Sequence, residues 1–325
     1  MSYTSRIKSE LVCGLCPHTC RIPEDGSGVC RVRANEKGTL SLPYFGKLSA
    51  IALDPIEKKP LYHFYPGSSI FSVGFYGCSF RCPFCQNYRI SQDVDSSTST
   101  VSPEECVKMA LKHNSFGIAY TYSEPLVHFE YVLETSRIAR EKGLKNILVT
   151  NGYINPKPAK ELLDTTDAAN VDLKSFSEDF YRDEIGGSLK PVLRFIKQAS
   201  ESIHLEITTL VIPGKNDSEK EISEIARFIA SVDRSIPLHL SAYYPTYKYV
   251  IAATSADTIR RLTDLASMHL DFVYPGNIGG PSRTVCPSCG STLIERRGYY
   301  TQVFGIKDGS CSHCGHRIYG VFNLV

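Results

Sequence analysis

Between about residues 71 and 274, short apolar segments alternate with longer segments in which apolar residues recur at helical spacing. Short uninterrupted apolar segments are typical of strands buried on both faces, and their alternation with amphipathic helices predicts parallel βαβ units. The expected strands are 71–75, 117–121, 146–150, 168–173, 204–212, 237–242 and 271–274. This succession predicts an α/β fold, a partial (β/α) TIM-like barrel.

Helix signals lie between the expected strands. The segment 102–105, SPEE, offers an N-cap hydroxyl, a proline at the first helical position and a glutamate at the third, and predicts a helix that continues over 107–113. Apolar periodicity predicts a second helix over 126–142, ended by Gly143 in a left-handed conformation. A third helix is expected over 219–232, with one apolar stripe formed by Ile222, Ile225, Ala226 and Ile229.

Composition changes this picture only modestly. The chain has 325 residues, 42% of them hydrophobic, which suffices for one large domain with small additions. We expect an N-terminal cysteine-rich segment over 1–60, the barrel over 61–280 and a C-terminal segment over 281–325. A net charge of +2 argues against a broad surface for nucleic acid, and the absence of a leader or a long apolar run predicts a cytoplasmic protein without a membrane partner.

Eleven of the twelve cysteines fall into three local groups with metal-type spacing, which favours reduced thiols that bind metal over disulfides. Cys106 lies in a helical pattern and is expected to be a buried apolar residue. The central group, Cys78, Cys82 and Cys85, follows the first expected strand in the run CSFRCPFC. Ligands of parallel α/β proteins bind at the C-terminal ends of the strands.

Three thiols are one fewer than the four that usually hold an iron-sulfur cluster. A 4Fe–4S cluster held by this group would leave one iron open, where a chelating small molecule could bind and accept an electron. The alternative is a fragment of a zinc site that lacks its fourth ligand. The position at the barrel rim favours the cluster.

The CxxxCxxC run at this position resembles that of the radical SAM superfamily. The resemblance implies a 4Fe–4S cluster that binds S-adenosylmethionine (SAM) and cleaves it reductively to methionine and a 5′-deoxyadenosyl radical. Phe84 matches the aromatic residue that lies against the adenine. Ser123 and Glu124, in TYSEP, are similar to the GGEP that receives the methionine amino group, although the glycines are absent.

Two further strand ends resemble those of glycyl-radical activating enzymes. Thr150 and Asn151 stand in a TNG, and Asp172 and Lys174 in a DLK. The resemblance implies that Asp172 and Thr150 orient the ribose or a monovalent cation and that Lys174 pairs with the SAM carboxylate. The segment 212–217, IPGKND, also resembles a loop of these enzymes.

The stretch 238–245, LHLSAYYP around His239, resembles one branch of the superfamily, the radical SAM member of the AmmeMemoRadiSam system. That branch also has the N-terminal CxLCPxxC run and the C-terminal CPxCG ribbon. Tyr244 stands where that branch has a histidine, which leaves the proton donor open. His239 itself is more simply a hydrogen-bonded histidine inside the barrel than a catalytic group.

The two outer cysteine groups predict additional metal sites. Two CxxCG knuckles near the C-terminus predict a zinc ribbon, in which the glycines take left-handed turns; its ligands would be Cys286, Cys289, Cys311 and Cys314. The N-terminal group fits either zinc or an auxiliary cluster, with free thiols as the alternative; it comprises Cys13, Cys16, Cys20 and Cys30.

These observations favour a radical SAM enzyme that abstracts hydrogen from an unidentified substrate. A one-electron donor such as a flavodoxin or ferredoxin is implied as a partner, and a protein substrate is one possibility. Two alternatives stay open: a glycyl-radical-enzyme activase, and a metal-stabilised protein- or RNA-binding adaptor without radical chemistry.

Overall fold

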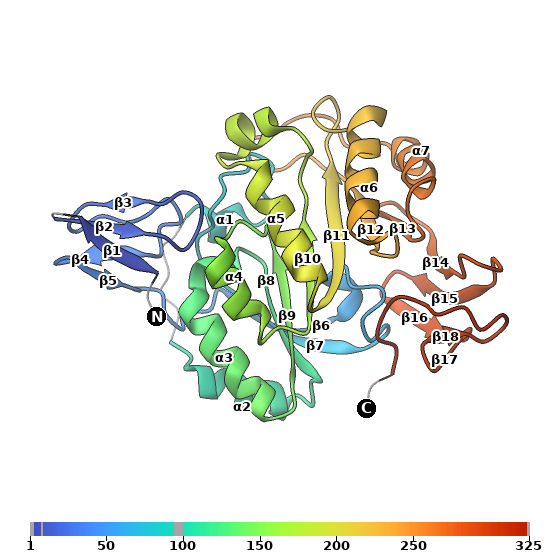
Figure 1. Cartoon of the computed structure of the whole chain (residues 1–325), viewed down its shortest axis with the longest axis horizontal. Helices are drawn as coiled ribbons and strands as arrows, with labels where there is room; N and C mark the ends of the chain where they lie inside the picture. The colour runs from blue at the N-terminus through green and yellow to red at the C-terminus, as the bar shows by residue number, and fades with distance from the viewer. Residues whose placement is uncertain (1–2, 8, 94–99, 324–325) are drawn as a thin grey trace.

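The computed structural model describes residues 3–7, 9–93 and 100–323. A curved eight-stranded sheet forms its centre (Figure 1), with the strand order β13-β12-β11-β10-β9-β8-β7-β6. All neighbours are parallel except β6 and β7, which are antiparallel. In the described ranges β6 and β13 do not pair, so the sheet is a partial barrel and not a closed one, which confirms the expected fold class.

All seven expected strands are present, with ends displaced by at most two residues. They are β7 (Ser69–Gly74), β8 (Gly117–Thr121), β9 (Lys145–Thr150), β10 (Ala168–Asp172), β11 (His204–Val211), β12 (Leu238–Ala242) and β13 (Val273–Gly276). An eighth strand, β6 (Ala50–Pro55), was not predicted and falls within the range 1–60. It forms the sheet edge and is half exposed, so it lacks the continuous apolar run that marks the others.

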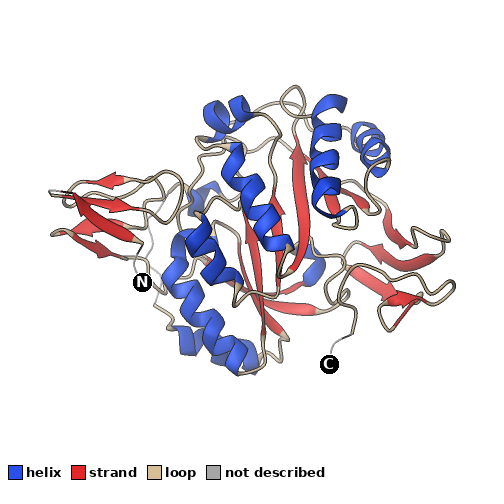
Figure 2. Cartoon of the chain, in the orientation of Figure 1, coloured by secondary structure: helices blue, strands red, loops and turns tan. Residues whose placement is uncertain are grey.

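Helices cover the outside of the curved sheet (Figure 2), and consecutive helices pack on one another. They are α2 (Pro103–Lys112), α3 (Phe129–Glu141), α4 (Pro156–Leu163), α5 (Leu189–Ser200), α6 (Glu219–Asp233) and α7 (Ala256–Ser267). A short α1 (Tyr88–Ser91) follows the central cysteines, a 3₁₀ turn, η2 (Pro125–His128), precedes α3, and a π-helical turn, η3 (Phe180–Ile185), precedes α5. A further 3₁₀ turn, η1 (Ile56–Lys58), follows β6.

The expected helix signals are confirmed. Ser102 accepts a hydrogen bond from the backbone N–H of Glu105, whose carboxylate accepts from the N–H of Ser102, so the capping box is complete. Gly143 ends the second helix with φ +78°. The second helix starts at Phe129 and not at residue 126, because Pro125 begins the preceding 3₁₀ turn. The apolar stripe of α6 is fully buried.

Small β-modules flank the sheet on opposite sides (Figure 1). The N-terminal one contains β1 (Thr4–Ile7), β2 (Glu10–Cys13), β3 (Arg21–Ile22), β4 (Ala34–Glu36) and β5 (Thr39–Ser41). The C-terminal one contains β14 (Pro281–Val285), β15 (Thr292–Arg297), β16 (Tyr300–Val303), β17 (Ile306–Lys307) and β18 (Ser310–Cys311). No helix in the described part of the chain has both the length and the apolar content to span a bilayer.

Candidate active site at the C-terminal rim of the sheet

The central cysteines lie in the loop that follows β7, at the C-terminal rim of the parallel strands. Gly77 enters this loop with φ +74°, and a Cβ at this position would collide with the carbonyl oxygen of Cys30. Cys82 is buried, whereas Cys78 and Cys85 are partly exposed, and all three are free thiols. The loop therefore presents three sulfurs near one another at the rim.

The surroundings of these sulfurs contain N–H and O–H groups. Cys78 Sγ accepts from the backbone N–H of Phe80 (3.3 Å) and lies 3.7 Å from the Nδ2 of Asn151. Cys85 Sγ lies 3.2 Å from Ser91 Oγ. Burial, followed by the negative charge of Glu124, raises the pKa of the Cys78 thiol well above its usual value. Bound metal would offset this cost, because it binds the thiolate form.

The spacing of the sulfurs distinguishes the central cysteines from the C-terminal cysteines, which have the geometry of a site for one metal ion. Among the described residues, the C-terminal cysteines are the set of three or more potential ligands whose donor atoms all lie within 4.8 Å of one another. The central three do not meet this spacing. Thiolates on one zinc ion lie only about 3.8 Å apart, as follows from a Zn–S bond of about 2.3 Å. A cluster has no such requirement, because each of its thiolates binds a different iron.

Glu124 follows β8 and is nearly fully buried, with 2% of its surface exposed. Its Oε1 accepts from Thr150 Oγ1 (2.6 Å) and from the backbone N–H of Leu126 (3.1 Å), and its Oε2 accepts from the N–H of Asn151 (2.8 Å). Burial raises its pKa to about 7, and the same three donors oppose the shift. An ionised carboxylate has about four lone-pair sites, so one remains for a further donor.

Asn151 connects the end of β9 to the cysteine loop. Its Nδ2 donates to Ser79 Oγ at 3.0 Å, and its Oδ1 accepts from the N–H of Tyr153 at 2.9 Å. The Oγ of Ser123 donates to the carbonyl of Phe75, at the start of the same loop. The residues expected after β8 and β9 are thus brought together around the loop that carries the cysteines.

Asp172 ends β10 and Lys174 follows it, and the two side chains form an ion pair at 2.9 Å. Burial opposes the charge of Lys174, but Asp172 and the Cys82 thiolate more than offset this and raise the pKa of the lysine. The backbone carbonyl of Lys174 accepts from Asn216 Nδ2 at 2.7 Å, which connects the IPGKND loop to the same rim. An ammonium has three donors, so Lys174 keeps some for a ligand.

Phe84 is 3% exposed and packs against Phe180 and Tyr249, with ring centroids 6.1 and 5.7 Å away. Tyr249 belongs to the loop after β12, and the N–H of Lys248 in that loop donates to the carbonyl of Pro83 at 2.9 Å. The Tyr249 hydroxyl also donates to Glu184. This covering loop was not predicted; the tyrosine-rich run 243–249 was its only signal in the sequence.

A second feature missed by the sequence analysis lies beside β8. Tyr122 has φ +68°, a left-handed conformation that suits glycine, at a place where related motifs have glycine. Its hydroxyl donates to Asp54 on β6, and Lys59 pairs with Asp54 at 2.6 Å and lies over the Tyr122 ring. Contacts with the unpredicted edge strand thus hold this turn.

His239 does not reach the rim. It lies near the start of β12, at the opposite end of the parallel strands, and its Nε2 is 2.7 Å from Glu206. Tyr244 is half exposed and donates to the carbonyl of Asn277. The structure thus agrees with the interpretation of His239 as a hydrogen-bonded histidine inside the barrel.

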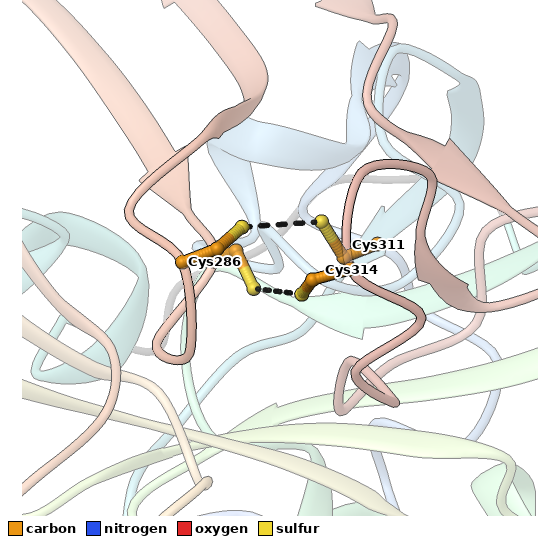
Figure 3. Close-up of side chains that lie close together, drawn as sticks. Cys286, Cys311 and Cys314 are labelled. Atoms are coloured by element: carbon orange, nitrogen blue, oxygen red, sulfur yellow. Dashed lines mark hydrogen bonds between the residues drawn. The ribbon is translucent and has the colours of Figure 1, made fainter.

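The C-terminal cysteines converge as expected (Figure 3). Cys286 Sγ lies 3.6 Å from Cys314 Sγ, and Cys289 Sγ lies 3.7 Å from Cys311 Sγ. Gly290 and Gly315 have φ +73° and +76°, which confirms the left-handed knuckle turns. The four thiols have the spacing of a tetrahedral metal site.

Comparison with known proteins agrees with this geometry. The model of the radical SAM superfamily matches residues 72–229, which include the cysteine loop and strands β8 to β11. The chain belongs to the radical SAM superfamily. It is an enzyme of the radical SAM class, and its family implies a 4Fe–4S cluster and SAM-dependent radical chemistry.

An uncharacterised protein of Methanocaldococcus jannaschii is 38% identical to this radical SAM protein over 98% of both chains. Pyruvate formate-lyase 1-activating enzyme of Escherichia coli is 25% identical over 55% of this chain and 76% of its own. A solved radical SAM methyltransferase from Sphaerobacter thermophilus shares the fold, with a TM-score of 0.53 and 16% identity over 65% of this chain and 67% of its own.

Proposed function

We propose that Cys78, Cys82 and Cys85 bind a 4Fe–4S cluster with one open iron, and that the enzyme uses it to cleave SAM and abstract hydrogen from a substrate. The observation that supports this proposal most directly is the arrangement of side chains at the C-terminal rim of the sheet. Three thiols from one loop lie beside polar groups from the ends of β8, β9 and β10. Hydrogen bonds connect the groups at the ends of β8 and β9 to one another and to the loop, and Asp172 and Lys174 form an ion pair at the end of β10. When bound, the cluster supplies the electron that breaks the sulfonium bond.

The polar residues would orient SAM. Glu124, with Ser123 beside it, would receive the methionine ammonium at its remaining lone-pair site. Three uncharged donors already hold this carboxylate in place, which supports the proposal. Lys174 would pair with the SAM carboxylate, while Asp172 and Thr150 would orient the ribose or a monovalent cation. Rigid placement of a substrate favours a reaction by reducing the entropy lost on the way to the transition state.

The remaining part of the site would protect the reaction from water. Phe84 would lie against the adenine, and the loop that carries Lys248 and Tyr249 packs over it. Exclusion of water strengthens electrostatic contacts and prevents side reactions of a radical. The electron would come from a small flavin or iron-sulfur protein such as a flavodoxin or ferredoxin.

The experiment is anaerobic reconstitution with iron and sulfide, followed by reduction in the presence of SAM and detection of 5′-deoxyadenosine. The wild type should form it, and Cys82→Ala should lower the rate by more than about 100-fold, since even outer-shell changes cost about 10- to 100-fold. Cys106→Ala is the matched control, because this thiol is buried in α2, away from the cysteine loop. No 5′-deoxyadenosine from a wild type that contains the cluster would contradict the proposal.

A glycyl-radical-enzyme activase is the more specific candidate. The similarity to pyruvate formate-lyase 1-activating enzyme favours it. Anaerobic mixing with SAM and a partner glycyl radical enzyme should then produce a protein-centred radical in the EPR spectrum of the partner. SAM cleavage without that signal would still support radical SAM chemistry but would exclude the partner glycyl radical enzyme as the substrate.

We also propose that the C-terminal quartet binds zinc as a structural ion. Its sulfur spacing and its left-handed glycines support a closed tetrahedral site. Membership of the AmmeMemoRadiSam branch is proposed on the CxLCPxxC run and the stretch around His239.

A further inference from the structure

A cavity in the N-terminal module is lined by four cysteines that the proposed reaction does not use. Cys13 ends β2, Cys16 and Cys20 lie in the loop before β3, and Cys30 lies in the loop before β4. All four are free thiols, and the rest of the lining is largely apolar, with Leu15 and Ile22 among it. Four thiols around one cavity are a ligand set for metal.

The spacing of these sulfurs differs from that of the C-terminal quartet. In the described ranges, the C-terminal four lie mutually within 4.8 Å, as one zinc ion requires, and no three of the N-terminal four do so. A cavity lies between them instead. Four thiolates around one cavity can bind a cluster, in which each sulfur binds a different iron.

Backbone N–H groups face these sulfurs. The N–H of Val29 donates to Cys20 Sγ at 3.5 Å. The backbone N–H of His18 also faces the Cys16 sulfur. The backbone N–H groups of Val32 and Arg33 likewise face the Cys30 sulfur. Hydrogen bonds to sulfur stabilise thiolates and set the potential of a cluster.

Arg33 lines the same cavity and is 1% exposed. Its two terminal nitrogens donate to Glu130 at 2.6 and 2.9 Å, while its Nε has no hydrogen-bond partner among the described groups. A buried donor without a partner costs about 1–3 kcal/mol. An anionic cluster in the cavity would supply the missing acceptor for this N–H group.

The cavity is in direct contact with the loop of the central cysteines. His18, between Cys16 and Cys20, has its Nε2 2.8 Å from the carbonyl oxygen of Ser79, the residue after Cys78. Cys30 packs against Gly77 through its carbonyl. Asn155, just beyond the TNG, donates to the carbonyls of Gly14 and Leu15 at 2.8 and 3.0 Å. The side chain of His18 thus connects the loop of the N-terminal cysteines to the loop of the central cysteines.

We propose that Cys13, Cys16, Cys20 and Cys30 hold a 4Fe–4S cluster that passes single electrons to the central cluster. The relay rests on the proposed function; the four-thiol site does not. One electron leaves a reduced flavin or iron-sulfur protein, reduces the N-terminal cluster and moves on to the central one, with no bond made or broken in these transfers. Cys16 and Cys20, the partly exposed ligands, lie on the side where a donor protein can approach.

Metal content tests the site. The full chain with Cys78, Cys82 and Cys85 changed to alanine, purified without air and reconstituted with iron and sulfide, should retain about four irons and four sulfides. It should give the EPR signal of a reduced cluster. The reverse variant, Cys16→Ser with Cys20→Ser, should lower the iron of the native chain from about eight to about four per molecule. A second zinc ion and no iron in the first variant, or unchanged iron in the second, would overturn the site.

The relay has its own readout, the ratio of SAM cleavage driven by reduced flavodoxin to cleavage driven by dithionite. In Cys16→Ser with Cys20→Ser this ratio should fall more than tenfold, while Thr19→Ala, an exposed change in the same loop, is the control. An unchanged ratio would overturn the relay. A wild type that contains both clusters but does not cleave SAM would instead overturn the proposed function, and the relay with it.

Discussion

Two buried glutamates at opposite ends of the parallel strands are held in different ways. Glu124, at the C-terminal rim, accepts from three uncharged donors, and burial raises its pKa to about 7. Glu206, near the N-terminal ends, accepts from the N–H groups of Tyr62 and His63 and contacts the Nε2 atoms of His204 and His239. Burial also opposes its charge, but the two histidines lower its pKa overall.

The difference separates a structural network from a binding site. All of the about four lone-pair sites of Glu206 have partners, and the network extends through His63 and Tyr274 to Thr284 of the C-terminal module. It has no capacity left for a ligand. Glu124 has an unused lone-pair site and forms no ion pair with any residue that the structure describes, so a bound ammonium would complete it.

Among the changes that test this comparison, Glu206→Gln is expected to have the largest effect. The change removes the charge and half of the acceptor capacity, and leaves buried donors without partners. We expect the free energy of unfolding to fall by about 3 kcal/mol, measured by urea unfolding. Glu201→Gln, exposed just before the same strand, should have almost no effect. A loss below about 1 kcal/mol would show that the network does not stabilise the fold.

A smaller effect is expected from the titration of Glu124. Its pKa in the folded protein is raised from 4.5 to about 7, so the folded state binds more protons than the unfolded state within this window. Stability contributed by that proton is fully present below pH 4.5 and is lost as the pH rises through 7, and about 2.5 kcal/mol of this loss falls between pH 5 and pH 8.

The measurement is the difference in unfolding free energy between the wild type and Glu124→Gln at pH 5 and at pH 8. Other titrating groups, such as His63 and His128, are common to both proteins and cancel. The difference should shift in favour of Glu124→Gln as the pH rises. A difference that does not depend on pH would mean that Glu124 titrates normally.

The smallest effect is expected from Lys174→Met. Loss of a charge-assisted hydrogen bond to the SAM carboxylate, worth about 1.5 kcal/mol, should weaken SAM binding about tenfold. Equilibrium dialysis with the reconstituted protein before reduction measures this without catalysis. Lys157→Met, an exposed change on α4, is the control. Equal affinity of Lys174→Met and the wild type would remove the lysine from the SAM site.

The parts of the molecule that local patterns determine were predictable. Buried parallel strands have continuous apolar runs, helix ends have local capping residues, and the ribbon cysteines stand in short motifs with glycine. Each of these signals lies within a few residues of the structure it specifies, as the capping box at Ser102 and the turn at Gly290 illustrate.

The missed parts depend on contacts between distant residues. Strand β6 is half exposed and forms the sheet edge, and its Asp54 meets Tyr122 across 68 positions of the sequence. Glu206 meets the N–H of His63 across 143 positions. The one local signal for this network was a charged residue inside the apolar run 204–212. The spacing of the N-terminal cysteines along the chain also left their metal open between zinc and a cluster.

The most direct test of the account is pulsed EPR of the reduced enzyme with SAM labelled with ¹⁵N in its amino group. If the three-thiol loop leaves an iron open and the rim orients SAM there, the cluster signal should show hyperfine coupling to the labelled nitrogen. Cys106→Ala should show the same coupling. A reduced central cluster whose spectrum is identical with and without labelled SAM would contradict the account.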